Sequence, residues 1–505
     1  MKKIMTRLLS LVLLGTFIPS FVLADNWDLD KGDITVSATA ENQTVSQAGG
    51  SPTVDHNPVI TSSGKTNNTV TITAEKNATA NVTLENVNID TGTTDEAAIT
   101  TSGEGNVNIE LNGTNTVQSG NTHAGVEKKD NGTLTITDEN KDGSLTATGG
   151  NYGAGIGGGY EGSGSNIAIE GGKVKAIGGT HGAGIGGGFG GSGSNIAIEG
   201  GKVEASSVGG GAGIGGGSLG SGSNIAVSGG EVTAQGGVGG AGIGGGQGGS
   251  GSKITISDGK VTATGAGAGA GIGGGYEGSG SGITIEGGEV TAQGDTGGAG
   301  IGGGISGTGS DVTISGDAQV KVQGGAADER WKEGAAIGNG GTRTTEGNEV
   351  SPNTSDLTVE GSIQIYEPGK NINTDTPDRT IEGQKGDHSW NAGEVTAETV
   401  PESKAAAYWV SDPEGQSIPY QAQQKDGVLT VTVQADTASL RGTTGSLRQL
   451  EAQGIAEIRF VTNRAQSDFA LSDLLTSGTG SFTLTHDGDK VTFTLENTDI
   501  SGILK

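Results

Sequence analysis

Aromatic side chains are scarce in this chain, at 3% of the residues, and three of them recur at one position of a repeated motif. Tyr160, Phe189 and Tyr276 share that position, and Trp331 follows Arg330 farther along the chain. Exposed rings in loops can stack on the apolar face of a sugar, whereas rings that pack over a neighbouring turn have only a structural role. We therefore predict a ligand-binding site at these five residues and keep structural packing as the alternative.

The acidic and basic residues do not form an evident catalytic set. A polysaccharide lyase needs several carboxylates for Ca²⁺ and a base that abstracts a proton. An enzyme would have to use the irregular stretch from Asp328 to Lys332, where the alternative is a solvated loop. The histidines show no metal-ligand spacing. We predict no catalytic residue, no metal site and no cofactor, apart from loosely bound Ca²⁺. Four aspartates share no single repeat position: Asp258, Asp295, Asp311 and Asp317.

The composition excludes several classes of partner and bond. The formal net charge is −28, which argues against nucleic acid and against anionic membrane surfaces, since both need clustered Lys and Arg. The chain has no cysteine, so disulfides and thiolate metal sites are excluded. Glycine accounts for 102 of the 505 residues, which leaves too little bulk for one large globular core but enough for a thin, repetitive one.

A repeat organises the middle of the chain. The motif Gly-Ala-Gly-Ile-Gly-Gly-Gly occurs six times with a period of 29 residues, and a period of this size indicates a repeat architecture. Each repeat contains three short strand-like segments and three turns, which predicts one coil of a right-handed parallel β-helix. We expect a mainly β solenoid of about ten coils. The isoleucines of the motif are Ile156, Ile185, Ile214, Ile243, Ile272 and Ile301.

The periodicity extends beyond these six repeats and also predicts which side chains face inward. Ile167 and Val174 recur as Ile or Val in every copy, as expected for internal ladders, and the residues between them should point outward. Earlier marker residues at Ile99 and Val126 indicate that the array starts before its glycine-rich part. After Gly325 the spacing breaks, and the next marker, Ile337, comes 36 residues after the last one.

Composition shifts along the chain predict five segments. Residues 1–24 have a basic start, an apolar stretch and a small-residue cleavage site, which is typical of a secretory signal peptide. No later stretch is long and apolar enough for a membrane span. We expect an N-terminal leader or cap at 25–57, the β-helix at 58–369 with regular repeats at 149–325, a linker or cap at 370–404, and a small α+β module at 405–505.

The repeat pattern Ile-x-Ile-x-Gly-Gly-x-Val-x-Ala, together with the glycine motif, resembles that of secreted bacterial proteins of the pectate-lyase-like β-helix type, many of them labelled as carbohydrate-binding or adhesin proteins. The resemblance covers about residues 95–366. It implies a secreted or cell-surface protein that binds polysaccharide or mediates adhesion. We expect a polysaccharide or surface glycan as the partner, repeated weak sites on the lateral faces, and a protein that is released or held non-covalently at the cell surface. Two alternatives stay open, namely a structural spacer that presents the C-terminal module and a polysaccharide lyase or hydrolase.

Overall fold

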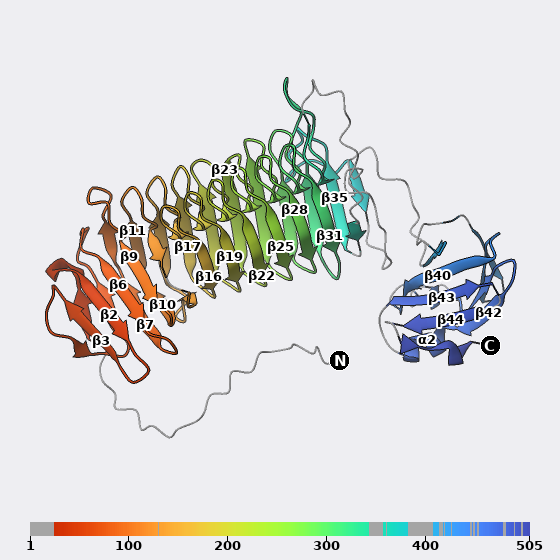
Figure 1. Ribbon diagram of the computed structural model, residues 1–505, viewed down its shortest axis with the longest axis horizontal. Helices are drawn as coiled ribbons and strands as arrows, with labels where there is room; N and C mark the ends of the chain where they lie inside the picture. The colour runs from red at the N-terminus through yellow and green to blue at the C-terminus, as the bar shows by residue number, and fades with distance from the viewer. Residues whose placement is uncertain are drawn as a thin grey trace.

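The computed structural model describes residues 25–342, 357–381 and 408–504, except residues 130, 360, 414–417, 419, 426, 445–446, 448–449, 452–453, 478–480, 489 and 496–497. Within these residues the protein is mainly β and forms a long parallel β-helix and a smaller C-terminal module (Figure 1). The predicted signal peptide at 1–24 and residues 382–404 of the predicted linker lie outside the described residues.

Three sheets build the β-helix, and between residues 79 and 338 each coil contributes one strand to each sheet. Sheet 1 has twelve strands, all parallel. They are β1 (Asn26–Asp28), β5 (Val59–Thr61), β7 (Thr79–Glu85), β10 (Asn106–Asn112), β13 (Leu134–Thr137), β16 (Gly164–Ile169), β19 (Gly193–Ile198), β22 (Gly222–Val227), β25 (Gly251–Ile256), β28 (Gly280–Ile285), β31 (Gly309–Ile314) and β34 (Leu357–Val359).

Sheet 2 has thirteen strands and sheet 3 has eleven. The strands of sheet 2 are β4 (Thr53–Val54), β3 (Gln43–Gln47), β2 (Ile34–Ala38), β6 (Val70–Ala74), β9 (Ile99–Gly103), β12 (Val126–Lys128), β15 (Ile156–Gly157), β18 (Ile185–Gly186), β21 (Ile214–Gly215), β24 (Ile243–Gly244), β27 (Ile272–Gly273), β30 (Ile301–Gly302) and β33 (Ile337–Gly338). Those of sheet 3 are β8 (Asn88–Asp90), β11 (Thr114–Gln118), β14 (Ser144–Thr148), β17 (Lys173–Gly178), β20 (Lys202–Ser207), β23 (Glu231–Val238), β26 (Lys260–Ala266), β29 (Glu289–Gln293), β32 (Gln319–Gln323), β35 (Ser362–Tyr366) and β36 (Arg379–Ile381).

The register between coils confirms the 29-residue period. Ile156 pairs with Ile185 in sheet 2, and Val126 pairs with Ile156, so the degenerate early repeats belong to the same stack. Ile301 pairs with Ile337 although the spacing there is longer, which shows that the additional residues lie in a turn. The inward side chains form one continuous buried core of Ile, Val, Leu and Ala along the β-helix. The predicted mainly β solenoid with a 29-residue repeat is confirmed, and its sheets of eleven to thirteen strands exceed the expected ten or so coils.

The two-residue strands of sheet 2 explain the repeated glycines. Gly157 and its equivalents in later coils adopt φ values of about +130° to +136°, a region that favours glycine. A Cβ atom at Gly157 would lie 2.0 Å from the carbonyl oxygen of Gly186 in the next coil. Glycine is therefore required both by the backbone conformation and by the close approach of adjacent coils.

An asparagine ladder runs along sheet 1. Asn166, Asn195 and Asn224 stand at positive φ near the start of strands β16, β19 and β22. The side-chain amide of Asn195 donates to Asn166 Oδ1 (2.8 Å), and that of Asn224 donates to Asn195 Oδ1 (2.6 Å). Asparagine tolerates the left-handed region, and its side chain can hydrogen-bond to the same residue of the next coil. It therefore suits this place in the strand.

The β-helix begins earlier than the predicted boundary at residue 58. Strands β1 and β2 already pair in parallel with β5 and β6, so much of the segment expected to be a leader or cap belongs to the first coil. Strand β3 then pairs antiparallel with β2, and β4 with β3, at the end of sheet 2. These early strands lack the glycine motif, which is why the repeat pattern did not reveal them.

The C-terminal module contains a five-stranded and a four-stranded sheet around a separate hydrophobic core. Its helix α2 (Leu471–Ser477) directly follows the strand that ends at Ala470. No helix among the described residues is long and apolar enough to cross a membrane. The strands are β37 (Tyr408–Ser411), β38 (Gln421–Lys425), β39 (Val428–Thr432), β40 (Thr437–Thr443), β41 (Glu457–Val461), β42 (Gln466–Ala470), β43 (Ser481–Asp487), β44 (Lys490–Leu495) and β45 (Thr498–Asp499).

Candidate functional site

Two rows of turns lie side by side along the β-helix, and we call them together the turn edge. The first row joins sheet 3 to sheet 2, and the second row joins sheet 2 to sheet 1. Backbone N–H groups of the second row donate to carbonyls of the first row, which fixes the two rows to each other. These bonds are Phe189 to Tyr152 (2.9 Å), Ser218 to His181 (2.8 Å), Gln247 to Gly210 (2.8 Å), Tyr276 to Gly239 (2.7 Å) and Ile305 to Ala268 (3.0 Å).

The second row is also hydrogen-bonded from one coil to the next. Its residues Tyr160, Phe189, Ser218, Gln247, Tyr276 and Ile305 occupy one repeat position. The bonds link Glu161 to Phe189 (2.9 Å), Gly190 to Ser218 (2.8 Å), Leu219 to Gln247 (2.7 Å), Gly248 to Tyr276 (2.9 Å) and Glu277 to Ile305 (2.9 Å). Side chains at this position are therefore held at the coil spacing of about 4.8 Å.

Four rings gather at one part of the turn edge, and we call them the N-terminal ring cluster. The rings of Tyr160 and Phe189 stack with centroids 5.8 Å apart and planes 12° apart, and those of Tyr152 and His181 stack at 5.2 Å and 13°. The Tyr152 ring also meets the Tyr160 ring edge-on at 5.4 Å. The Glu161 carboxylate beside Tyr160 raises the pKa of its phenol above the ordinary value.

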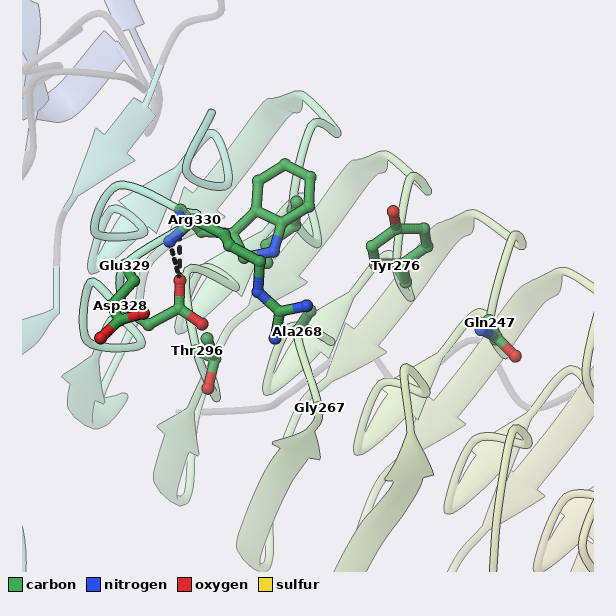
Figure 2. Close-up of a pocket in the computed structure, with 10 residues that line it drawn as sticks. Gln247, Gly267, Ala268, Tyr276, Thr296, Asp328, Glu329 and Arg330 are labelled. Atoms are coloured by element: carbon green, nitrogen blue, oxygen red, sulfur yellow. Dashed lines mark hydrogen bonds between the residues drawn. The ribbon is translucent and has the colours of Figure 1, made fainter. Parts of the chain in front are cut away.

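A second pair of rings, Tyr276 and Trp331, lies several coils farther along the turn edge. They help to line a pocket of about 590 Å³, which we call the Trp331 pocket. The ring of Tyr276 meets the indole of Trp331 edge-to-face, with centroids 6.2 Å apart. Figure 2 shows Gln247 and Tyr276 on successive coils and Asp328, Glu329 and Arg330 on the loop at the end of the pocket. The lining residues are Gln247, Gly267, Ala268, Tyr276, Thr296, Ile305, Asp328, Glu329, Arg330 and Trp331.

The inserted loop that supplies Trp331 is held by its own hydrogen bonds. Asp328 Oδ1 accepts from the backbone N–H groups of Arg330 and Trp331, both at 2.8 Å, and the N–H of Asp328 donates to the carbonyl of Trp331 at 3.0 Å. The N–H of Lys332 donates to the carbonyl of Thr342 at 2.8 Å. Asp328 thus positions the two neighbouring site residues, because its carboxylate closes a tight turn around them.

A charged group lies beside the N-terminal ring cluster, in an open pocket of about 640 Å³ that Tyr160 also lines. The buried carboxylate of Glu127 contacts His123 Nδ1 and Lys129 Nζ, both at 2.6 Å, and accepts from the N–H of Ala124 at 3.1 Å. In the next coil the equivalent N–H, of Ala154, donates to the carbonyl of Gly158. Glu127 therefore replaces a backbone acceptor where the glycine-rich coils begin, which is a structural role.

The structure divides the predicted site residues into two groups. It brings Tyr276, Arg330 and Trp331 together in one pocket, and it places Tyr160 and Phe189 in the separate ring cluster. Tyr160 and Tyr276 are four coils apart, about 19 Å at the coil spacing. Four further residues of these two groups were not predicted as site residues from the sequence: Tyr152, His181, Gln247 and Thr296. The signal available for Tyr152 and His181 was their separation by one repeat length.

Acidic side chains do not converge on a metal site in the part of the chain that the structure describes. No group of three or more His, Cys, Asp or Glu side chains there is arranged to hold a metal ion. The loosely bound Ca²⁺ allowed by the sequence analysis therefore stays a prediction without a defined site. The pocket-lining acids belong to the loop described above and include Asp328, whose carboxylate is engaged by the backbone.

Comparison with known proteins identifies the repeat. A family model described as a β-helix repeat matches residues 141–160, 167–189, 196–218, 225–247, 254–276 and 283–305. Each of the six matched segments ends at the second-row repeat position of the turn edge that Tyr160 and its equivalents occupy. No curated protein and no solved structure matches the chain.

Proposed function

We propose that this parallel β-helix repeat protein binds a polysaccharide or surface glycan along its turn edge. The observation that carries the proposal is the Trp331 pocket, in which an indole and a phenol ring stand beside planar polar side chains. Aromatic faces suit the apolar C–H faces of sugars, and Gln, Asp, Glu and Arg side chains suit their hydroxyl groups. A site with few, converging polar groups around rings is typical of small-molecule recognition.

The charge of the protein favours a neutral glycan. The formal net charge of −28 disfavours association with a polyanion, since like charges lower the encounter rate and the affinity. The pocket itself carries Asp328 and Glu329 beside the single cation Arg330. We therefore propose neutral sugars as the ligand class, with Arg330 donating to hydroxyl oxygens.

We also propose that the protein is secreted and acts outside the cell, either released or held non-covalently at a surface. The support is the composition of residues 1–24, with Lys2, Lys3 and Arg7 before an apolar stretch that ends at Ala24. N-terminal sequencing of the exported protein tests this proposal directly. A mature chain that starts at Asp25 supports it, and an intracellular full-length chain contradicts it.

A glycan array followed by calorimetry tests the binding function. We expect the wild-type protein to bind at least one neutral glycan and Trp331→Ala to lower the affinity about five- to thirtyfold, because removal of one stacking ring costs about 1–2 kcal/mol. Val54→Ala is the matched control, since Val54 is an exposed apolar residue away from the turn edge. Wild-type protein that binds no glycan contradicts the proposal and favours the structural-spacer alternative.

A further inference from the structure

Leu219 occupies an unusual place on the turn edge. Its side chain is 63% exposed, and its backbone has φ +69°, in the left-handed region. A bulky residue in this region is a genuine outlier, because its Cβ crowds the following carbonyl. An exposed leucine also gains little from burial, so neither the backbone nor the core accounts for this side chain. The other residues at this repeat position, all at positive φ, are Glu161, Gly190, Gly248, Glu277 and Ser306.

Two exposed valines accompany Leu219. Val208 is 66% exposed and directly follows β20, and Val238 is 65% exposed and is the last residue of β23, so both stand where the first turn row begins. Val238 Cγ1 lies 2.9 Å from the position that a Cβ at Gly267 would occupy, and Gly267 lines the Trp331 pocket. We call Val208, Leu219 and Val238 the apolar track.

The apolar track occupies the interval between the two groups of rings. Phe189 and Tyr276 are three coils apart, about 14 Å at the coil spacing, and the track residues belong to the coils between them. Among the described residues, four of the five large apolar side chains recorded as exposed lie on the turn edge: Tyr160, Val208, Leu219 and Val238, with Val54 elsewhere. Such a concentration of exposed apolar surface marks an interaction site.

We infer that the N-terminal ring cluster, the apolar track and the Trp331 pocket form one continuous binding surface for an extended neutral polysaccharide that lies across the coils. This inference rests on the proposed function and adds the orientation and minimum length of the ligand. The backbone hydrogen bonds between the two turn rows and between successive coils keep the surface rigid, so ligand binding does not have to order it. A short saccharide fills one end only, and a longer chain gains the contacts of the track and of the second end.

The test uses length series of neutral cello-, xylo- and manno-oligosaccharides, from disaccharide to hexasaccharide, and the full-length protein. In at least one series we expect affinity to rise with length, and Leu219→Asn to weaken the longest ligand about tenfold while leaving the disaccharide unchanged. Asparagine tolerates the left-handed region, so this variant should keep the melting temperature of the wild type. Val54→Asn is the control and should leave every affinity unchanged.

The outcomes separate the inference from the proposed function. One outcome is that oligosaccharides bind with an affinity that Trp331→Ala lowers but that neither ligand length nor Leu219→Asn changes. That result supports the Trp331 pocket as a binding site and overturns the continuous surface. If none of the series and no array glycan binds, the proposed function itself fails. If Leu219→Asn instead abolishes a self-association seen by sedimentation, the track is an interface between copies of this chain, which also overturns the inference.

Discussion

Gly215→Ala tests the physical reason for the repeated glycines. Gly215 ends β21 with φ +133°, and a Cβ there would lie 2.0 Å from the carbonyl oxygen of Gly244 in the next coil. That oxygen accepts a hydrogen bond from the N–H of Gly216 at 2.9 Å. The methyl group must therefore push the two coils apart at a buried backbone hydrogen bond.

The expected loss follows from two contributions. Backbone strain at this φ costs about 1–3 kcal/mol, and an unsatisfied buried hydrogen-bonding group costs a further 1–3 kcal/mol or so. We expect a total loss of about 2–6 kcal/mol for Gly215→Ala. Gly190→Ala is the matched control, because Gly190 also has positive φ, at +70°, but its Cβ would meet only Glu161 Cγ at 4.0 Å. That variant should lose about 1–2 kcal/mol from strain alone.

Urea denaturation followed by far-ultraviolet circular dichroism measures both variants. Native-state amide exchange locates the effect, since in a solenoid each coil contacts only its neighbours and the loss should be largest around β21 and β24. Equal denaturation midpoints for Gly215→Ala and Gly190→Ala would show that the coils accommodate a methyl group there, and the argument from close approach would be wrong.

Three further predictions concern buried and stacked polar groups. Burial lowers the pKa of His486 to about 4 from 6.5. The C-terminal module should therefore lose up to about 3 kcal/mol of stability as the pH falls from 6.5 to 4, with no effect above pH 6.5. His486→Gln should remove this pH dependence in thermal melts recorded across the pH range. Glu127→Ala leaves the N–H of Ala124 without its acceptor and should cost about 1–3 kcal/mol of stability in urea titrations. Glu127→Gln keeps an acceptor and should cost less. Equal losses for the two variants would contradict the acceptor role. Asn195→Ala breaks two hydrogen bonds of the asparagine ladder at a residue with φ +54° and should cost about 2 kcal/mol of stability, measured in the same way. Asn195→Gly loses the same bonds but adopts this φ without strain, so it should cost less. The reverse order would refute the argument.

The periodic sequence determined most of the β-helix because every coil repeats the same constraints. The spacing of Ile156 and its equivalents predicted the register that sheet 2 shows, and the alternation around Ile167 and Val174 predicted the buried ladders. The pairing of Ile301 with Ile337 confirms that the break after Gly325 lengthens a turn. The first coil was harder to predict, since β1 and β2 pair like later strands without sharing their glycines.

The candidate site was predictable only in part. Its residues come from different turns of a coil, and the path of the chain around the coil decides which of them meet. Tyr152 and Tyr160 are eight positions apart in one repeat, and nothing in their spacing shows that their rings meet. Likewise, the length of the insertion does not show that Trp331 folds back onto Tyr276. The stretch from Asp328 to Lys332 was recognised as irregular, but the hydrogen bonds by which Asp328 positions Arg330 and Trp331 depended on the fold.

The lengthened turn after Gly325 has a consequence for how this surface changes in evolution and in the laboratory. The strands on both sides of the turn keep their register, as the pairing of Ile301 with Ile337 shows, so extra residues there are tolerated without repacking the core. A pocket of different shape and charge can then arise by exchanging one loop while the coils stay as they are. The same turn in any other coil is a natural site for grafting a designed loop, with its distance from the Trp331 pocket chosen by counting coils.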